Sequence, residues 1–418
     1  MGFIKFFSLL AVIPGIFSLA GAQQKLRYKN ILLRDFRTVK NGQVINFNIG
    51  TAAHAPATLA VLKKYLPQET KITVWADAPL SAELAAMMSR RFPDVKIVHG
   101  DLQKNPSQEL LDAVDNADLF LVSSGSTIAG SVQKSMKDFK LRTGKNAGAY
   151  AIGCTPGLIP LIDKLDFGWF RDPVAAEIAE KSSCPVKGWA PDAVFDFDAV
   201  DEENAGIFLK KHGLERNRFI CCIPGQRYTP RWKFFNQAEN PQKTAVNAEF
   251  EEHDNAPLRE IIKIAVSEYN LKVLICPEQV SEIALIRPRI FDKLPADIQK
   301  HCVVMDSMWS PDTALGVYMQ SRGVFGVEIH SQVMAIGKNV PGLLLYPPEF
   351  GSKGQMWKSI GVPEWLIYTD SPDYASRAVA TAREILSDPE KNAEKLRRAR
   401  KIIDEANKNA IKKSFFIE

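Results

Sequence analysis

Several features that identify common protein classes are missing from this chain. The net charge of +5 is small for 418 residues, and no run of basic residues is interleaved with aromatic ones, which argues against a nucleic-acid partner. The six cysteines lack the spacing of a zinc site. After residue 22, no apolar run is long enough to cross a bilayer. What remains is an ordinary globular composition, 46% apolar and 24% charged, in a chain long enough for two domains.

The first 22 residues have the composition of a secretory signal. Lys5 precedes the apolar segment Phe6–Leu19, and Ala20-Gly21-Ala22 provides a small-residue cleavage signal. We therefore expect a cleaved signal peptide over residues 1–22, with the mature protein in the secretory pathway, the periplasm or the extracellular space. An uncleaved membrane anchor is the alternative, but the apolar segment is short and is interrupted by Pro-Gly.

Strand-like and helix-like segments alternate through residues 23–200, the expected N-terminal Rossmann-like domain. This alternation predicts a parallel sheet with helices on both faces. The expected strands are Asn30–Leu33, Val44–Phe47, Lys71–Trp75, Val95–Val98, Leu119–Val122 and Ala147–Ile152. The expected helices are Ala52–Tyr65, Ser81–Phe92, Pro106–Val114 with Asn105 as its cap, and Thr127–Lys140.

Residues 201–370 repeat the alternation and predict a second, C-terminal Rossmann-like domain. The acidic segment Asp196–Ala205 lacks periodicity and is expected to link the two domains. Two closing helices are expected within residues 371–418. The expected strands are Phe219–Ile223, Lys272–Cys276, Val303–Met305, Gly323–Ile329, Val340–Tyr346 and Leu366–Tyr368.

Small and polar residues follow several of these strands. Asn48–Thr51, Ser123–Ser126 and Gly153–Gly157 follow strands of the first domain, and His330 follows a strand of the second, just before a helix. The carboxyl ends of parallel strands gather at one edge of a sheet, and helix amino termini favour anions. These loops therefore predict an anion-binding site.

The order of these motifs resembles that of the polysaccharide pyruvyl transferase family. Its members carry a strand ending in Arg-x-His, then a helix, then a strand with an early proline and a lysine beyond it. The matching residues here are Glu328-Ile329-His330, Val340-Pro341 and Lys353, preceded by Asn48-Ile49-Gly50-Thr51, the Ser-Gly loop at 123–126, Arg171-Asp172 and Pro191-Asp192. Glu328 replaces the family's arginine, and Thr51 replaces an aspartate. The resemblance covers residues 47–368 and implies a glycosyltransferase-B-like fold of two Rossmann-like domains, with the ligand between them.

The resemblance further implies an enzyme that moves the pyruvyl group of phosphoenolpyruvate onto a sugar of a polysaccharide or glycan, with no cofactor. Acid–base chemistry near neutral pH suits histidine, so His330 is the first catalytic candidate, with Glu328 beside it. The donor's carboxylate and phosphate need cationic clamps. The expected substrate-binding residues are Asn48, Gly50, Ser124, Gly125, Arg171, Arg227 and Lys353.

These candidates rest on different grounds. Arg171 and Lys353 follow from the resemblance, whereas Arg227 is a candidate because it clusters with Arg231 and Lys233 after a strand. His54, in the first turn after the Asn-x-Gly loop, is a further candidate for ligand contact.

No metal site is expected, because His212, His253 and His301 are scattered along the sequence. Two other functions fit the departures from the family pattern. In a nucleotide-sugar glycosyltransferase, Glu328 would act as a base or bind a ribose. In a non-catalytic glycan-binding protein, the changes at Glu328 and Thr51 would mark a lost donor site.

Overall fold

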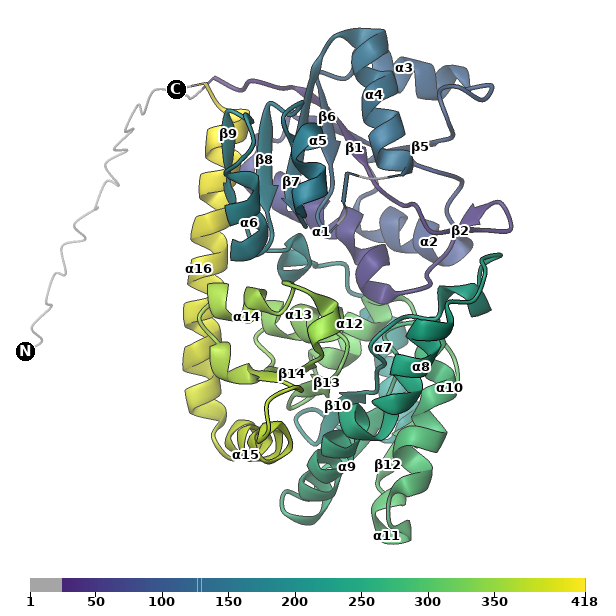
Figure 1. The fold of residues 1–418 in the computed structure, drawn as a ribbon, viewed down its shortest axis with the longest axis vertical. Helices are drawn as coiled ribbons and strands as arrows, with labels where there is room; N and C mark the ends of the chain where they lie inside the picture. The colour runs from purple at the N-terminus through teal and green to yellow at the C-terminus, as the bar shows by residue number, and fades with distance from the viewer. Residues whose placement is uncertain (1–24, 126, 129, 418) are drawn as a thin grey trace, which may run out of the picture.

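The computed structural model describes residues 25–125, 127–128 and 130–417. Figure 1 shows two α/β domains stacked along the long axis of the molecule, with one long helix running beside both. The expected secretory signal, residues 1–22, lies outside the described residues. Within the described part of the chain, no helix has the length and apolar character needed to cross a membrane.

The N-terminal domain is built on a parallel sheet whose inner strands are largely buried on both faces, as expected when helices cover both sides. In the described residues its strand order is β5 (Lys96–His99), β4 (Lys71–Ala76), β1 (Asn30–Arg34), β6 (Leu119–Val122), β7 (Asn146–Ile152), β8 (Phe167–Phe170) and β9 (Val186–Trp189). Its helices are α1 (Ile49–Tyr65), α2 (Ala82–Arg91), α3 (Gln108–Asn116), α4 (Ser131–Thr143), α5 (Ile159–Ile162) and α6 (Pro173–Ala179).

The C-terminal domain repeats this construction. Its described strands, again parallel, lie in the order β12 (Cys302–Val304), β11 (Lys272–Ile275), β10 (Phe219–Ile223), β13 (Val324–Gly326), β14 (Gly342–Tyr346) and β15 (Leu366–Tyr368). Its helices are α7 (Glu202–His212), α8 (Pro241–Glu249), α9 (Glu251–Ser267), α10 (Ile283–Leu285), α11 (Ala296–Gln299), α12 (Pro311–Tyr318), α13 (His330–Gly337) and α14 (Gln355–Ser359). Both expected Rossmann-like domains are therefore present.

Helix α1 lies at the boundary between the two domains. Asn48 caps it, because its Oδ1 accepts a hydrogen bond from the Thr51 amide (2.9 Å). Residues 52–62 are all buried, so the helix is covered on every side. It contacts α12 and α13 of the C-terminal domain, and it therefore carries His54 to a position between the domains.

The strand-end loops of the C-terminal domain bond directly to the start of α1. The Ile49 amide donates to the Glu278 carbonyl (3.0 Å), and the Val280 amide donates to the Phe47 carbonyl (2.9 Å). Because Glu278 follows β11, this contact brings the carboxyl edge of the second sheet against the first domain.

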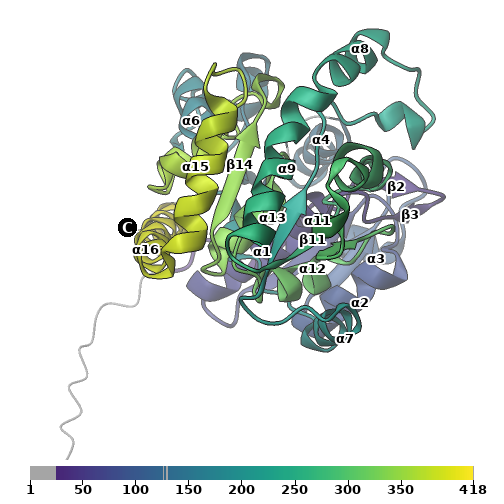
Figure 2. The same cartoon turned by 90° about the horizontal axis from the view of Figure 1, so that it is seen from below.

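The closing helices belong to different parts of the molecule. α15 (Tyr374–Ser387) packs on the C-terminal domain, whereas α16 (Pro389–Phe415) runs along both domains (Figures 1 and 2). Near the far end of α16, Asn407 accepts from the Tyr150 hydroxyl (2.6 Å) and donates to Asp196 (2.7 Å). The Arg27 amide donates to the Phe415 carbonyl (2.7 Å). The described part of the closing segment, residues 371–417, thus completes the N-terminal domain as well as the C-terminal one.

Two expectations for the N-terminal domain were wrong. Val44–Phe47 is not a strand of the main sheet: β2 (Val39–Lys40) and β3 (Gln43–Val44) form a separate antiparallel hairpin. Asn41-Gly42, both at positive φ, make its turn. The cap of α3 is Ser107, which accepts from the Leu110 amide (3.2 Å), and not Asn105.

Two boundaries also differ in the second half. The expected linker Asp196–Ala205 is shorter, because Asp201 caps α7 by accepting from the Asn204 amide (3.0 Å), and α7 begins at Glu202. The strand expected over Gly323–Ile329 is only Val324–Gly326, so that His330 opens α13 and does not end a strand.

Candidate active site

A cavity of about 280 Å³ opens between the two domains. The N-terminal domain contributes residues from 38 to 51, and the strand-end loops of the C-terminal domain contribute the rest. We call this cavity the interdomain cleft. Its lining residues are Thr38, Phe47, Asn48, Thr51, Arg227, Tyr228, Thr229, Arg231, Gln279, Glu328, Ile329, His330, Glu349, Phe350 and Lys353.

Glu278 joins the cleft wall to the start of α13. Its carboxylate accepts from the Ser331 amide (2.7 Å) and hydroxyl (2.9 Å), and it lies 3.2 Å from His330 Nδ1. Although burial opposes ionisation, the hydrogen bonds from His330 and Ser331 lower the pKa of Glu278. A buried carboxylate from another strand thus caps the amino terminus of α13 and fixes the orientation of the His330 ring.

Glu328, which stands in place of the family's arginine, faces the cleft. Its Oε1 accepts from the Gln279 side chain (2.7 Å). Burial, together with the negative charge of Glu278, raises the pKa of Glu328 to about 8. Burial also raises the pKa of the neighbouring Glu282 well above its ordinary value. With a pKa of about 8, Glu328 is mostly neutral at pH 7, and the cleft is therefore less negative than the sequence indicates.

Two cations border the cleft without a carboxylate partner among the described residues. Lys353 is half-buried, and burial lowers its pKa, with Arg171 nearby adding to the effect. Arg231 lies over the ring of Phe235 at 4.5 Å and over that of Phe47 at 5.6 Å. Unpaired cations at a cavity are suited to an anion.

Arg171 lies behind the cleft in a buried ion pair. Its guanidinium contacts the Asp192 carboxylate (3.1 Å), which also accepts from the Ser124 hydroxyl (3.0 Å). Burial opposes ionisation of this aspartate, but the Arg171 guanidinium and the hydrogen bond from the Val194 amide hold the pKa of Asp192 below its ordinary value. The predicted substrate residues Ser124 and Arg171 are thus brought together, but they hold Asp192 and do not line the cleft.

The predicted residues Gly50 and Gly125 make room for two histidine rings. A Cβ at Gly50 would lie 2.1 Å from the His330 ring, and one at Gly125 would lie 1.9 Å from His54. The two rings face each other edge to face with centroids 5.1 Å apart. Burial lowers the pKa of His54 to about 3, so its imidazole is neutral.

Arg227 borders the cleft, but its donors are occupied. It makes two bonds to Asp254 (2.9 and 3.0 Å) and one to Glu349 (3.0 Å), and it lies 3.4 Å over the ring of Phe250. Its neighbour Lys233, also a candidate, does not line the cleft. Of the loop cluster, Arg231 is the cation that remains available.

Sequence reasoning missed Glu278 and did not foresee the role of Asp192. A signal for Glu278 was present, because Pro277-Glu278-Gln279 follows the expected strand Lys272–Cys276 at the same sheet edge as His330. No local signal indicates that Asp192 meets His54, which lies on a different element.

Comparison with known proteins shows the fold. No protein-family model and no curated protein matches the chain. Among solved structures, a putative UDP-N-acetylglucosamine 2-epimerase from Listeria monocytogenes is 15% identical, with a TM-score of 0.52 over 88% of this chain and 90% of that one. UDP-GlcNAc 2-epimerase from Neisseria meningitidis is 12% identical, with a TM-score of 0.52 over 91% and 98%. The expected fold class is confirmed: two Rossmann-like domains in the glycosyltransferase-B arrangement.

Proposed function

We propose that the chain is a transferase that moves the pyruvyl group of phosphoenolpyruvate onto a sugar of a polysaccharide or glycan. The observation that carries the proposal is the presence of Lys353 and Arg231 in the interdomain cleft, both without a carboxylate partner among the described residues. An anionic donor substrate would supply the negative charge that pairs with Lys353 and Arg231. The order of family motifs around Glu328, His330 and Lys353 favours a donor that carries both a carboxylate and a phosphate.

Neutral groups of the cleft complete a site for such a donor. Thr229 and Gln279 are joined by a hydrogen bond (3.1 Å), and Asn48 lies across from them at the start of α1. The Thr229 proton is used in that bond, so the side-chain N–H groups of Gln279 and Asn48 are the neutral donors available to a phosphate oxygen. Because Glu328 is neutral at pH 7, its replacement of the family's arginine does not make the cleft repel an anion.

We assign Glu328 as the proton donor, because its carboxyl lines the cleft beside Lys353. Its proton passes to the methylene carbon of the enolpyruvyl group, and positive charge develops on the adjacent carbon. A sugar hydroxyl adds to that carbon and returns a proton to Glu328. A second hydroxyl of the same sugar then displaces phosphate, which leaves with the remaining proton, and a cyclic ketal results.

His330 borders the same cavity, but its nitrogens are directed elsewhere. Nδ1 is bonded to Glu278, and Nε2 is buried without a partner. The acid–base role expected for His330 stays a prediction, and the geometry favours Glu328 for direct proton transfer.

Nucleotide-sugar transfer is a second candidate function. A nucleoside diphosphate is also an anion that Lys353 and Arg231 would hold, and the solved structure from Neisseria meningitidis contains UDP-GlcNAc. In addition, Glu349 Oε2 is buried at the cleft without a hydrogen-bond partner, and a ribose hydroxyl would satisfy it.

Calorimetric titration with phosphoenolpyruvate and, separately, with UDP-GlcNAc tests the two functions. Losing a charge-assisted hydrogen bond costs about 1.5–3 kcal/mol, so Lys353→Met should weaken phosphoenolpyruvate binding about 10- to 100-fold. Lys104→Met removes an exposed lysine that does not line the cleft and should leave phosphoenolpyruvate binding unchanged.

The outcomes separate the alternatives. Saturable phosphoenolpyruvate binding, together with phosphate release that depends on an added polysaccharide, supports pyruvyl transfer. Binding of UDP-GlcNAc alone would move the assignment to glycosyl transfer. Binding of a glycan with no turnover of either donor would identify a non-catalytic protein.

A further inference from the structure

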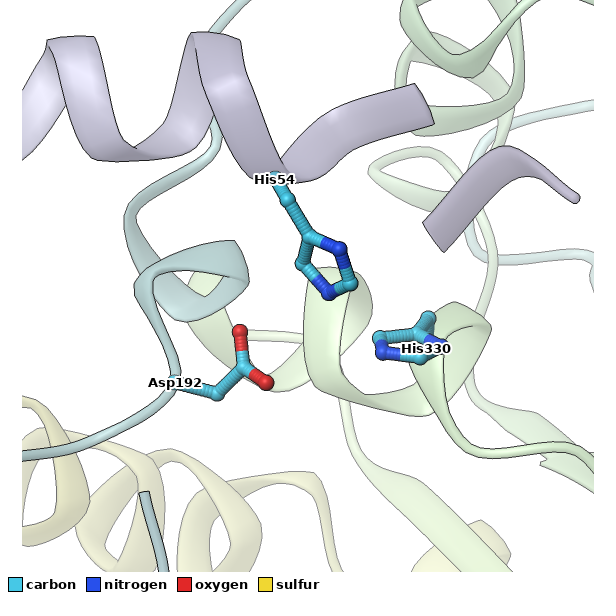
Figure 3. Close-up of side chains that lie close together, drawn as sticks. All are labelled: His54, Asp192 and His330. Atoms are coloured by element: carbon cyan, nitrogen blue, oxygen red, sulfur yellow. The ribbon is translucent and has the colours of Figure 1, made fainter. Parts of the chain in front are cut away.

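Behind the interdomain cleft, three side chains from distant parts of the chain converge (Figure 3). His54 comes from α1, Asp192 follows β9, and His330 opens α13. One ring nitrogen of each histidine and a carboxylate oxygen of the aspartate all lie within 4.8 Å of one another. His54 is 5% exposed and Asp192 is fully buried.

The two histidines present nitrogens that nothing else satisfies. His54 Nε2 and His330 Nε2 are both buried and have no hydrogen-bond partner. A buried polar atom without a partner costs free energy, so such atoms in a folded protein call for an explanation. In Figure 3 a nitrogen of each ring points into the space beside the Asp192 carboxylate.

We propose that His54, Asp192 and His330 bind a divalent transition-metal cation of the zinc class, which bridges the two domains. Two imidazoles and one carboxylate are a common ligand set for such ions in proteins. Mg²⁺ and Ca²⁺ prefer oxygen ligands, so the two nitrogens favour a transition metal.

Hydrogen bonds around these ligands fit the assignment. Glu278 is hydrogen-bonded to Nδ1 of His330, which leaves Nε2 for the ion. In metal sites, a carboxylate commonly bonds the histidine nitrogen that does not bind the metal, and it fixes the orientation of the ring. Arg171, Ser124 and the Val194 amide hold the Asp192 carboxylate in place. One lone pair of that carboxylate remains for a metal, because its oxygens accept three bonds and can accept about four.

Two carboxylates, Asp192 and Glu278, place negative charge beside the proposed ion, although Asp192 also pairs with Arg171. The rings are held in position by packing, because Gly50 and Gly125 leave the space that they fill. A zinc-class ion coordinated at about 2.0–2.1 Å in tetrahedral geometry has ligand atoms about 3.3 Å apart. The three ligand atoms here lie within 4.8 Å of one another. Movement of each side chain by about 1 Å would therefore bring them to coordination distance.

The consequence is a link between the domains. His54 and Asp192 belong to the N-terminal domain and His330 to the C-terminal one, so a bound ion would hold the two domains together in this arrangement. This role is independent of pyruvyl transfer, and its test measures metal binding and stability, not turnover.

The experiment titrates the full chain, freed of metal by a chelator, with Co²⁺ and with Zn²⁺. The expected results are one-to-one binding by calorimetry, a visible absorption band for Co²⁺, and a thermal midpoint that rises with metal concentration. Binding should be lost in His54→Ala, in Asp192→Asn and in His330→Gln. His301→Ala removes an exposed histidine elsewhere and should leave binding unchanged.

Histidine nitrogen NMR of the unmodified protein decides the case if a variant fails to fold. Zn²⁺ should shift two Nε2 signals together. The proposal is overturned if the chain binds neither ion, if His54→Ala retains the binding, if His301→Ala abolishes it, or if no pair of histidine signals responds.

Discussion

Replacing Asn407 with leucine should destabilise the protein, because this amide joins α16 to the N-terminal domain. Asn407 is fully buried, its Oδ1 accepts from the Tyr150 hydroxyl (2.6 Å), and its Nδ2 donates to Asp196 (2.7 Å). Leucine has a similar size but makes neither bond. The Tyr150 hydroxyl would be left unsatisfied, whereas Asp196 keeps Arg400. An unsatisfied buried polar group costs about 1–3 kcal/mol and a lost hydrogen bond about 1 kcal/mol, so we expect a loss of about 2–4 kcal/mol.

Asn409 provides the matched control, because it is exposed on the same helix. Asn409→Leu changes the intrinsic helix propensity by the same amount as Asn407→Leu. The difference between the two variants in the free energy of unfolding therefore measures the contribution of the buried hydrogen bonds. Denaturant unfolding followed by circular dichroism measures that difference. If the two variants unfold at the same denaturant concentration, the reasoning is wrong.

Three further predictions concern the site. In thermal unfolding, Gly125→Ala should lower the stability by about 1–3 kcal/mol more than the control Gly130→Ala. Both glycines have positive φ, but an added methyl group would collide with the His54 ring at Gly125 and would meet nothing at Gly130. Equal losses of stability in the two variants would contradict this. Glu328→Gln should keep phosphoenolpyruvate binding within a few-fold and lose phosphate release, and a fully active variant would remove Glu328 from the mechanism. Arg227→Met should destabilise the fold by about 3 kcal/mol in denaturant unfolding, because buried Asp254 loses both bonds to Arg227 and keeps only His253 among the described residues. An unchanged free energy of unfolding would contradict this.

Much of the fold could be predicted because each main strand has its own local signature. The residues of β6 are all buried and apolar, for example, and they follow a helix of clear periodicity. Val44–Phe47 was misassigned because burial there has another origin. Phe47 packs against Phe234 and Phe235 of the other domain, at centroid distances of 5.3 and 5.1 Å. An apolar residue at a domain contact looks in sequence like one within a sheet.

The rule that ligands bind where strands end predicted His330, which lines the cleft. Glu328 and Lys353 line the cleft too, but they were expected from the family resemblance and not from that rule. Arg227 also follows a strand, but its ion-pair partner Asp254 lies 27 residues further along the chain, in α9. No local sequence pattern predicts an ion pair between residues so far apart. The meeting of His54 with Asp192 depends on how α1 is seated between the domains, which is a property of tertiary packing.

The path of α16 has a consequence for synthesis on the ribosome. Trp169 donates to the Ser414 hydroxyl (2.7 Å), and the Lys25 carbonyl accepts from the Ile417 amide (2.9 Å). The first domain to emerge therefore lacks these contacts until α16 and Ile417 are translated. At about 5–20 residues per second, the delay is about 10–40 s, during which the uncovered side of β8 and β9 is open to chaperones.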